Sequence, residues 1–536
     1  MGPVTAIRLT WVHPEDLVGH ELRQAAEDGR RAEPLLRAWL AAGGHLAPAR
    51  AGASPAPPAP ELRCLASRLL AELAELPSPQ AQDEPTAWPA ITAACARATA
   101  PGGEGSPAPP LPGTRGQPPD PGSSPPGRKA ADGLARPGPG GAAPAGPPAP
   151  PDPGGPGGRS TRGLRGGARE GAEAFGPGGC PRPGPDPALQ ARLEAAWLGR
   201  AVGCVLGKPV EKLPLEGIRA LARAAGNWPL ADWFTAEGVP AELLAAYPWN
   251  RRSAATSLAE NIDGTPEDDD LNYPLLNLLL MQRHGRHFTT ADVARLWLDE
   301  LPAGRTFTAE RLAYRNLLLG LEPPATATHH NPFREWIGAL IRADVHGWTN
   351  PGDPAAAAAQ AYRDAALTHT GNGVYAALFT AAAIAEATTG QADVHSALRA
   401  GLAVVPPRSR LAEAVRHAID TAERHADFDR VVDRLHARYG HYHWVHAVPN
   451  TALIAAALTH GDGDFTRSVC RVVSGGWDTD SNGATAGSLA ALVDGNGVPA
   501  RWSAPLKNRL ATTVPGFDGI GFDTLAQLTA QEAARP

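Results

Sequence analysis

A run of four acidic residues, 267–270 (EDDD), is the first feature of the sequence whose residue types could do chemistry. Adjacent carboxylates repel one another unless a positive charge neutralises them. Such a cluster offers the hard oxygen ligands that Mg²⁺ and similar cations prefer. The alternative is a solvated acidic run at the start of a helix, where the helix dipole stabilises each carboxylate by ~0.3–1 kcal/mol. The run therefore indicates either a metal site or an exposed helix start.

A second candidate site lies in residues 475–483 (GGWDTDSNG), where Asp478, Asp480 and Ser481 stand between glycines. Two carboxylates and a hydroxyl at this spacing can reach one centre, and the flanking glycines allow the backbone angles that turn them inward. The alternative is an Asx-type turn that caps the following helix, with Asp480 or Ser481 as the N-cap.

The two acidic stretches lie about 200 residues apart in the sequence and together supply about five carboxylates. That number is enough to hold two divalent cations with a water molecule between them. A water bound in this way has a lowered pKa and can attack an electrophilic carbon. The pair of stretches therefore predicts a hydrolytic metal centre, provided that the fold brings them together.

Residues 197–211 (WLGRAVGCVLGKPVE) are predicted to be the end of a helix that closes in a glycine turn. Gly199, Gly203 and Gly207 are spaced four apart, so they lie on one face of this helix. A face of small residues allows another helix to approach closely. Glu211 ends the stretch and, taken alone, is typical of a surface acid.

The elements that would position these residues are helices. Apolar residues recur at helical spacing in nine segments of the C-terminal part, and alternating strand patterns are almost absent. Residues 374–388 are apolar nearly all round, which predicts a central buried helix. The nine predicted helices cover residues 188–205, 275–283, 290–299, 354–366, 374–388, 409–422, 450–460, 464–474 and 484–493.

The chain divides into three predicted blocks. Residues 1–98 are predicted to form short helices, which either pack on the C-terminal block or make an independent helical module. In residues 101–185, 47 of 85 residues are Gly or Pro, and only four are large and apolar. So few apolar side chains cannot offset the entropy of ordering the chain, so residues 99–187 are predicted to be a disordered linker. Residues 188–536 carry ten of the 13 Trp and are predicted to form a single large, compact, all-α multi-helix domain.

The order of these motifs resembles that of the ADP-ribosylglycohydrolase family. Along residues 188–530, the resemblance rests on a glycine-rich helix ending in LGKPVE, an acidic DDD at a helix start, an LTH segment and GGWDTDSNGA. The GGWDTDSNGATAGSL stretch is the specific part of the match. The resemblance implies an all-α fold with two Mg²⁺ ions, or Mn²⁺, in a central cleft. It also implies hydrolysis of the bond at C1″ of the terminal ribose in ADP-ribosylated or related substrates.

On this resemblance, the first metal motif falls on the DDD, where the family usually has Thr-Asp-Asp-Thr. Asp268 then takes the first position and Leu271, which offers no ligand, takes the last; an alternative register begins at Glu267. The implied metal ligands are Asp268, Asp269, Asp270, Asp478, Asp480 and Ser481. The implied catalytic residues are Glu211, Asp269 and Asp270, with Glu211 orienting the attacking water or the ribose hydroxyls.

The resemblance also implies residues that bind the substrate. They are Gly338, Arg342, His369, Gly371, Asn372, Gly373, Gly475 and Gly476. Taken alone, His369 is more typical of a buried structural histidine. The sequence departs from the family pattern at Cys204, where the family commonly has Asp, and at Ile337, which replaces Asn.

The sequence thus predicts a metal-dependent hydrolase that cleaves the glycosidic bond at C1″ of ADP-ribose in an ADP-ribosylated protein or a related ADP-ribose conjugate. One alternative is a catalytically weak or inactive module of the same fold that binds ADP-ribose or a nucleotide, which Leu271, Cys204 and Ile337 support. Another is a related metal hydrolase that acts on another nucleoside or on a phosphate ester.

The composition excludes several other classes of protein. The net charge of −6 divides into +3 for residues 101–185 and −9 for the remainder, which argues against a nucleic-acid partner. No apolar run reaches the ~18–20 residues of a membrane span, and residues 1–10 lack the pattern of a secretory signal. The five Cys are too scattered for a disulfide framework. Together these features predict a cytoplasmic protein with no membrane partner.

Overall fold

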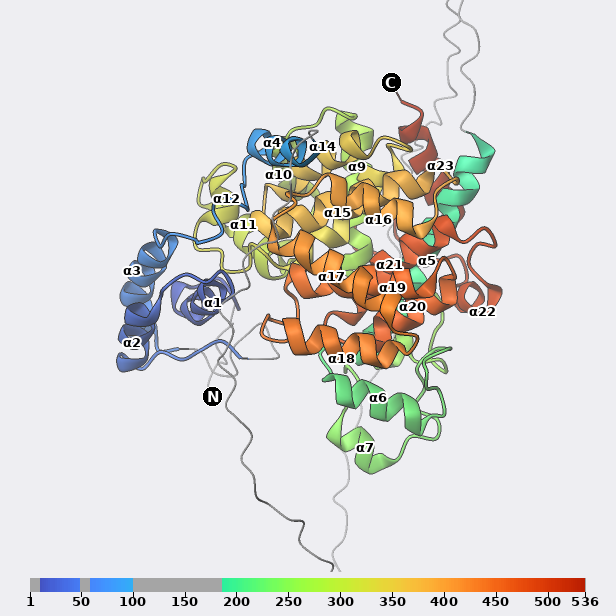
Figure 1. The fold of residues 1–536 in the computed structure, drawn as a ribbon, viewed down its shortest axis with the longest axis horizontal. Coiled ribbons are helices and arrows are strands. Elements are labelled where there is room, and N and C mark those ends of the chain that lie inside the picture. Colours follow the sequence, from blue (N-terminus) through green and yellow to red (C-terminus); the bar gives the residue numbers. More distant parts are fainter. Residues whose placement is uncertain (1–9, 49–57, 100–185, 536) are drawn as a thin grey trace, which may run out of the picture. The chain divides into compact units, whose positions relative to one another are not determined.

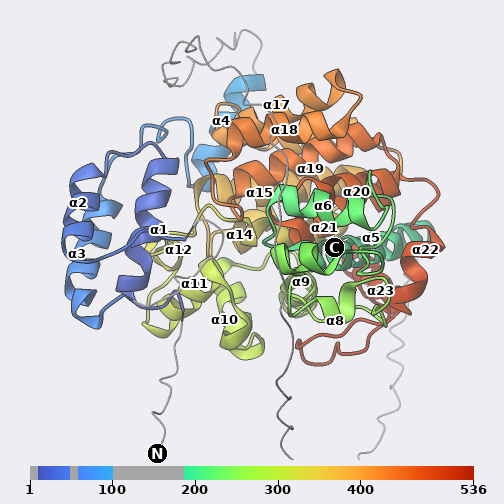
Figure 2. The ribbon, with the colours of Figure 1, turned by 90° about the horizontal axis from the view of Figure 1, so that it is seen from below.

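The computed structural model describes residues 10–48, 58–99 and 186–535. Within these ranges the secondary structure is helical, with no β-strand and only three isolated bridges between single residues (Figures 1 and 2). The all-α fold predicted from the sequence is therefore confirmed. The segment 99–187, predicted to be a disordered linker, lies almost entirely outside the described residues.

The helices fall into an N-terminal and a C-terminal part. The N-terminal part comprises α1 (Pro14–Glu27), α2 (Glu33–Ala41), η1 (Pro60–Leu62), α3 (Arg63–Ala74) and α4 (Trp88–Thr99). The C-terminal part begins with α5 (Pro187–Gly207), η2 (Lys208–Val210), α6 (Leu215–Ala224), α7 (Ala241–Ala246), α8 (Ala254–Ser257), α9 (Asp269–His284), α10 (Thr290–Glu300), η3 (Ala303–Arg305), α11 (Thr308–Leu318) and α12 (Ala325–Thr328). It continues with η4 (Ile337–Arg342), α13 (Asp344–Trp348), α14 (Pro354–Ala365), α15 (Gly371–Thr388), α16 (Val394–Ala403), α17 (Arg410–Arg424) and α18 (Phe428–Tyr439). It ends with α19 (Ala447–Gly461), α20 (Phe465–Ser474), α21 (Thr479–Val493), α22 (Ala500–Ser503), η5 (Ala504–Leu506) and α23 (Phe522–Ala533).

Helix α15 is the central buried helix that the sequence predicts. All of its residues except Glu386 are buried, and it packs against α13, α14 and α16. The helix begins three residues earlier than predicted, at Gly371, whose φ of +47° favours glycine. A helix that is apolar on every side can be stable only inside a larger core, and α15 provides the middle of that core.

Helices α5 and α21 pack backbone against backbone through glycines. A Cβ atom on Gly203 would lie 1.8 Å from the carbonyl oxygen of Gly483, and one on Gly199 would lie 2.4 Å from that of Gly487. A Cβ on Gly207 would lie 2.2 Å from the carbonyl oxygen of Thr479. The predicted glycine face of α5 therefore meets a matching glycine face on α21. This glycine seam brings the C-terminal end of α5 to the start of α21.

Helix α9 begins at the acidic run. The side chain of Asp268 caps the helix by accepting a hydrogen bond from the backbone N–H of Asp270. Gly285, with a φ of +69°, ends it. The Arg200 side chain on α5 donates a hydrogen bond from Nε to the carbonyl oxygen of Asp270 (2.8 Å), which ties the first turn of α9 to α5. Both acidic stretches thus start helices that are fixed to α5.

The N-terminal helices pack on the C-terminal part of the chain. The apolar side chains of α1 and α3 share a core with Phe333 and Trp336. Arg410 at the start of α17 forms an ion pair with Glu84 (2.7 Å between Nη2 and Oε2). The described N-terminal helices thus make both apolar and ionic contacts with the C-terminal part. Among the helices that the structure describes, none has both the length and the apolarity that crossing a membrane requires.

Candidate metal centre

The two acidic stretches lie next to each other in the fold. Residues 268–270 begin α9 and residues 478–480 begin α21, and both starts lie beside the end of α5. Their carboxylates also perturb one another. Burial, followed by the negative charges of Glu211 and Asp268, raises the pKa of Asp480 to about 7. The fold therefore joins the two stretches into one acidic centre.

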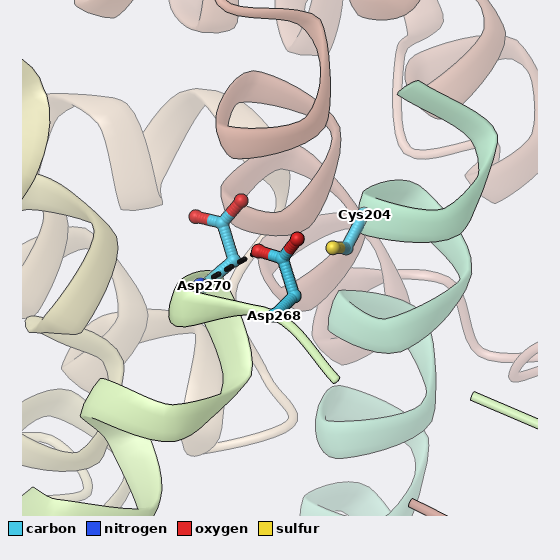
Figure 3. A group of neighbouring side chains, drawn as sticks. All are labelled: Cys204, Asp268 and Asp270. Carbon is cyan, nitrogen blue, oxygen red and sulfur yellow. Dashed lines mark hydrogen bonds between the residues drawn. The ribbon is translucent and has the colours of Figure 1, made fainter. Parts of the chain in front are cut away.

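The first group of possible metal ligands comprises Cys204, Asp268 and Asp270, which extend toward one another from α5 and from the start of α9 (Figure 3). One ligand atom from each residue lies within 4.8 Å of the others. Burial, followed by the charge of Asp268, raises the pKa of the Cys204 thiol well above its usual value. Because the thiolate is the form that binds metals, this group offers carboxylate oxygens more readily than sulfur.

Asp268 is the carboxylate of this group that the protein itself neutralises. Its Oδ1 accepts the hydrogen bond that caps α9 (2.9 Å), and its Oδ2 forms an ion pair with Nζ of Lys208. Burial alone would raise the pKa of Asp268, but Lys208 and the hydrogen bonds hold it below the ordinary value. Asp270 is only 2 % exposed, whereas Glu267, Asp268 and Asp269 are partly exposed, so the run is partly buried at the start of the helix.

Asp269 and Asp270 lack such a close lysine. Burial, followed by the charges of Asp268 and Asp480, raises the pKa of both carboxyl groups well above the usual value. The nearest cation to Asp270 is Arg200, whose Nη2 lies 3.7 Å from Oδ1 of Asp270. This Oδ1 atom is buried and makes no hydrogen bond within the described structure. A cation placed here would therefore relieve both repulsion and an unmet hydrogen-bonding capacity.

The second group of possible metal ligands comprises Glu211, Asp478 and Asp480, again with one ligand atom each within 4.8 Å of the others. Burial, followed by the charges of Asp480 and Glu211, raises the pKa of Asp478 well above its usual value. Ser481 is buried beside them and donates its backbone N–H to Oδ1 of Asp480 (3.1 Å). Asp478 takes the N-cap position of α21 but makes no capping hydrogen bond with its side chain. The alternative of a capping turn with Asp480 or Ser481 as N-cap is therefore wrong.

Glu211 directly follows η2 and is the member of this group that comes from neither α9 nor α21. Its Oε2 accepts a hydrogen bond from Nδ2 of Asn250 (2.6 Å), and its Oε1 pairs with Nζ of Lys212 (2.7 Å). The Lys212 side chain is half exposed. Glu211 thus combines one fixed oxygen with one oxygen whose partner can move away.

The loop before α21 is held by ring stacking and by an asparagine. Trp477 has a φ of +56° and stacks on the His436 ring of α18, with ring centroids 4.0 Å apart. His436 Nε2 also lies 2.8 Å from the carbonyl oxygen of Gly475. Asn450 of α19 accepts hydrogen bonds at Oδ1 from the backbone N–H of Asp478 (3.1 Å) and from Nδ2 of Asn482 (2.7 Å). These contacts fix the glycine pair 475–476 and the direction in which Asp478 enters the centre.

Three of the residues implied to bind substrate lie in a separate buried network. Arg342 has no exposed surface and donates to Asp364 Oδ2 (2.9 Å) and to Glu310 Oε1 (2.8 Å). Gly338 leaves room for the Glu310 carboxylate, because a Cβ there would lie 2.1 Å from Oε1. His369 is also buried, and burial followed by the charge of Arg342 lowers its pKa well below the usual value. The protein groups that engage Arg342 are not part of the acidic centre, so this network supports the core around η4 and α14.

The Gly371–Asn372–Gly373 turn is engaged by protein groups as well. Asn372 donates to Oε1 of Glu335 from both its backbone N–H and its Nδ2, each at 2.9 Å. Its Oδ1 accepts the backbone N–H of Leu411 (2.9 Å). Leu271, the position without a ligand atom, is fully buried in the apolar core. The structure thus brings the acids, Ser481 and the 475–476 glycines together, and it shows the other implied substrate contacts engaged by protein groups.

Sequence analysis missed the side chains that support the centre. They are Arg200, Lys208, Asn250, His436 and Asn450. Of these, only Lys208 could have been suspected from the sequence, because it directly follows the last glycine of the seam. The others stand alone in the sequence, and only the fold brings them to the acids.

The donor set of the centre fits a hard divalent cation. Its carboxylates come from Glu211, Asp268, Asp269, Asp270, Asp478 and Asp480. Three of the four aspartates with raised pKa are buried, and a bound cation would stabilise their ionised form. Carboxylate oxygens at this density are the ligands that Mg²⁺ and Mn²⁺ take in proteins.

Comparisons with known proteins find a matching family model and similar solved structures. The family model described as ADP-ribosylglycohydrolase matches residues 185–534. One solved structure that the chain matches is described as an ADP-ribosylglycohydrolase-related protein complex and is 22% identical in sequence to this chain. The match covers 65% of this chain and 98% of that chain, with a TM-score of 0.40. No curated protein matches the chain.

Proposed function

This chain belongs to the ADP-ribosylglycohydrolase family, and from that premise we propose that it hydrolyses the glycosidic bond at C1″ of ribose in ADP-ribosylated proteins or related ADP-ribose conjugates. The reaction would depend on a divalent cation, Mg²⁺ or Mn²⁺, held by the acidic centre. The observation that carries the proposal is the convergence of Glu211, Asp478 and Asp480 within 4.8 Å, beside the carboxylates that begin α9.

A cation bound by these carboxylates would fix the ribose hydroxyls and supply a water molecule with a lowered pKa. Glu211 is suited to accept the proton of that water, because Asn250 holds one of its oxygens (2.6 Å) while the partner of the other, Lys212, is half exposed. The remaining carboxylates face the positive charge that develops on the ribose in an oxocarbenium-like transition state and stabilise it.

A second candidate function is a module of the same fold that binds ADP-ribose without hydrolysing it. The ion pair between Lys208 and Asp268 favours it, because an implied metal ligand is already engaged by a protein cation. The two functions differ in their need for metal. A binding module would take up ADP-ribose in the presence of a chelator and would release no product.

The test is release of free ADP-ribose, followed by chromatography and mass spectrometry, from arginine-, serine- and nucleic-acid-linked substrates and from small-molecule conjugates. We expect the Mg²⁺-loaded protein to release ADP-ribose from at least one of them. Asp480→Asn should lower kcat/KM by about 100-fold or more, since even loss of a residue that only orients a ligand costs about 10–100-fold.

The matched control for this variant is Asp462→Asn, which makes the same change at an exposed aspartate after α19 and should leave kcat/KM unchanged. If the metal-loaded protein released no ADP-ribose from any of these linkages, the proposed function would be wrong.

A further inference from the structure

A groove between α17 and α18 carries a net positive charge. The two helices lie side by side in both views (Figures 1 and 2), and the groove between them has a volume of about 380 Å³. Its charged lining residues are Asp420 and Arg424 of α17 and Arg434 and Arg438 of α18. Three arginines thus face one aspartate, whereas the chain outside residues 101–185 is acidic as a whole. A basic groove on an acidic protein attracts anions to one place.

Arg434 and Arg438 are the cations of this groove that lack a carboxylate partner. Arg424 pairs with Asp420 (2.5 Å between Nη2 and Oδ1), so these two charges largely cancel. Both α18 arginines are exposed, and neither forms an ion pair with any of the described residues. Because they stand one helical turn apart and both line the groove, their guanidinium groups are available to the same ligand.

The pKa of His417, another lining residue, indicates that the positive charge is not compensated. Burial lowers the pKa of His417, and the charge of Arg438 lowers it further. Asp420 acts in the opposite direction, but the charges of Arg424 and Arg434 add to that of Arg438. The imidazole therefore lies in a positive field that the single aspartate does not balance.

The groove and the acidic centre lie on different sides of α18. Successive residues of an α-helix are turned by about 100°, so His436 points about 160° away from Arg434 and from Arg438. His436 stacks on Trp477, in the loop that leads into the acidic centre, with ring centroids 4.0 Å apart. A ligand in the groove would therefore occupy a site of its own.

We propose that the groove between α17 and α18 binds a diphosphate group, either that of inorganic pyrophosphate or that of a nucleoside diphosphate. A guanidinium group matches a phosphoryl group through two parallel hydrogen bonds, so two unpaired guanidinium groups can each take one phosphoryl group. A volume of about 380 Å³ lies within the ~300–1,000 Å³ range of small-molecule sites. The inference goes beyond the proposed function, because it assigns a second site that needs no divalent cation.

The test is a calorimetric titration of the full chain with inorganic pyrophosphate and, separately, with ADP, in EDTA and at constant ionic strength. We expect one pyrophosphate to bind per chain. Arg434→Gln and Arg438→Gln should each weaken binding by about tenfold or more, because each removes charge-assisted hydrogen bonds to the ligand. Tighter binding of ADP would show that the groove also binds the nucleoside, and equal affinities would show that it binds the diphosphate alone.

Two surface variants on the same helices serve as controls of opposite kinds. Asp420→Asn removes the aspartate of the groove and frees Arg424, so it should tighten pyrophosphate binding by up to about fivefold. Arg430→Gln removes the same charge from α18 as the test variants do, but Arg430 lies 3.8 Å from Asp427 and does not line the groove. It should change the affinity by less than about twofold.

Three results would overturn the inference. One is an absence of pyrophosphate binding at millimolar concentration. Another is an equal loss of affinity in Arg430→Gln and Arg434→Gln, which would mean that the anion responds only to the general charge of α18. The third is a preference for an RNA oligonucleotide over both pyrophosphate and ADP. Because the titrations contain no divalent cation, each of these results leaves the proposed hydrolysis to its own test.

Discussion

The acidic centre at the starts of α9 and α21 and the ion network that joins α1 to α17 are both buried, and both contain several carboxylates. They differ in their partners. In the ion network, Glu335 pairs with Arg410 (2.9 Å) and accepts a hydrogen bond from Gln24 of α1 (3.0 Å). Arg410 also pairs with Glu84 (2.7 Å). The carboxylates of this network thus meet guanidinium groups at direct contact distance.

The pKa values reflect this difference. Burial alone would raise the pKa of Glu335, but Arg410 and His446 hold it well below the usual value. In the acidic centre, burial and mutual repulsion raise the pKa of Asp270 and Asp478 well above the usual value. Buried carboxylates whose pKa is held down by arginine partners indicate a structural contact, whereas buried carboxylates whose pKa mutual repulsion keeps raised indicate a site that receives a cation from outside.

Removing one acid from the ion network should have the largest effect on stability. Glu335→Gln leaves the buried guanidinium of Arg410 with one carboxylate fewer, and breaking a buried pair in this way typically costs about 3–5 kcal/mol. We expect the free energy of unfolding in urea to fall by about that amount. The Mn²⁺ stoichiometry of the acidic centre should stay the same.

The control for this variant is Glu322→Gln, at an exposed position without an ion pair in the described structure, which should change the free energy of unfolding by less than about 0.5 kcal/mol. A Glu335→Gln protein as stable as the Glu322→Gln control would show that the ion network does not stabilise the contact between α1 and α17.

The acidic centre was more accessible to prediction from the sequence than the ion network. Its acids are clustered at 268–270 and 478–480, and the glycines at spacing four predict the helix contact that joins the two stretches. The network is assembled from single residues such as Glu84, Glu335 and Arg410, which no local pattern connects. Lys208 was missed for a related reason, because the contact of its side chain with Asp268 depends on where the fold places the start of α9.

Disrupting the glycine seam should weaken metal binding at the acidic centre and leave the ion network intact. In Gly203→Ala the new Cβ would meet the backbone oxygen of Gly483 at 1.8 Å, and since backbone cannot turn aside, α5 and α21 have to separate. We expect a loss of about 1–3 kcal/mol in the free energy of unfolding. Mn²⁺ affinity should fall as well, measured by calorimetry, while hydrogen-exchange protection of α1 persists.

Gly304→Ala is the matched control for the seam, because a Cβ there has open space around it and the backbone is not in the left-handed region. It should preserve both stability and Mn²⁺ affinity. Equal Mn²⁺ affinity in Gly203→Ala and Gly304→Ala would mean that the seam does not position the centre.

The pH dependence of stability has opposite signs in the two regions. The pKa of Asp480 is about 7 in the metal-free fold against 3.8 as its ordinary value, so the folded state holds an extra proton between these values. Stability of the metal-free protein should therefore fall as pH rises from about 4 to about 7, by up to about 1.4 kcal/mol per pH unit for this group.

Glu335, whose pKa is lowered, contributes its full stabilisation above about pH 4.5 and loses it only at lower pH. Between pH ~5 and ~7, where Glu335 stays ionised, Asp480→Asn should make stability fall less steeply with rising pH, whereas Glu335→Gln should shift the curve without changing its slope. A slope that Asp480→Asn leaves unaltered would contradict the assignment of the uncompensated charge to this centre.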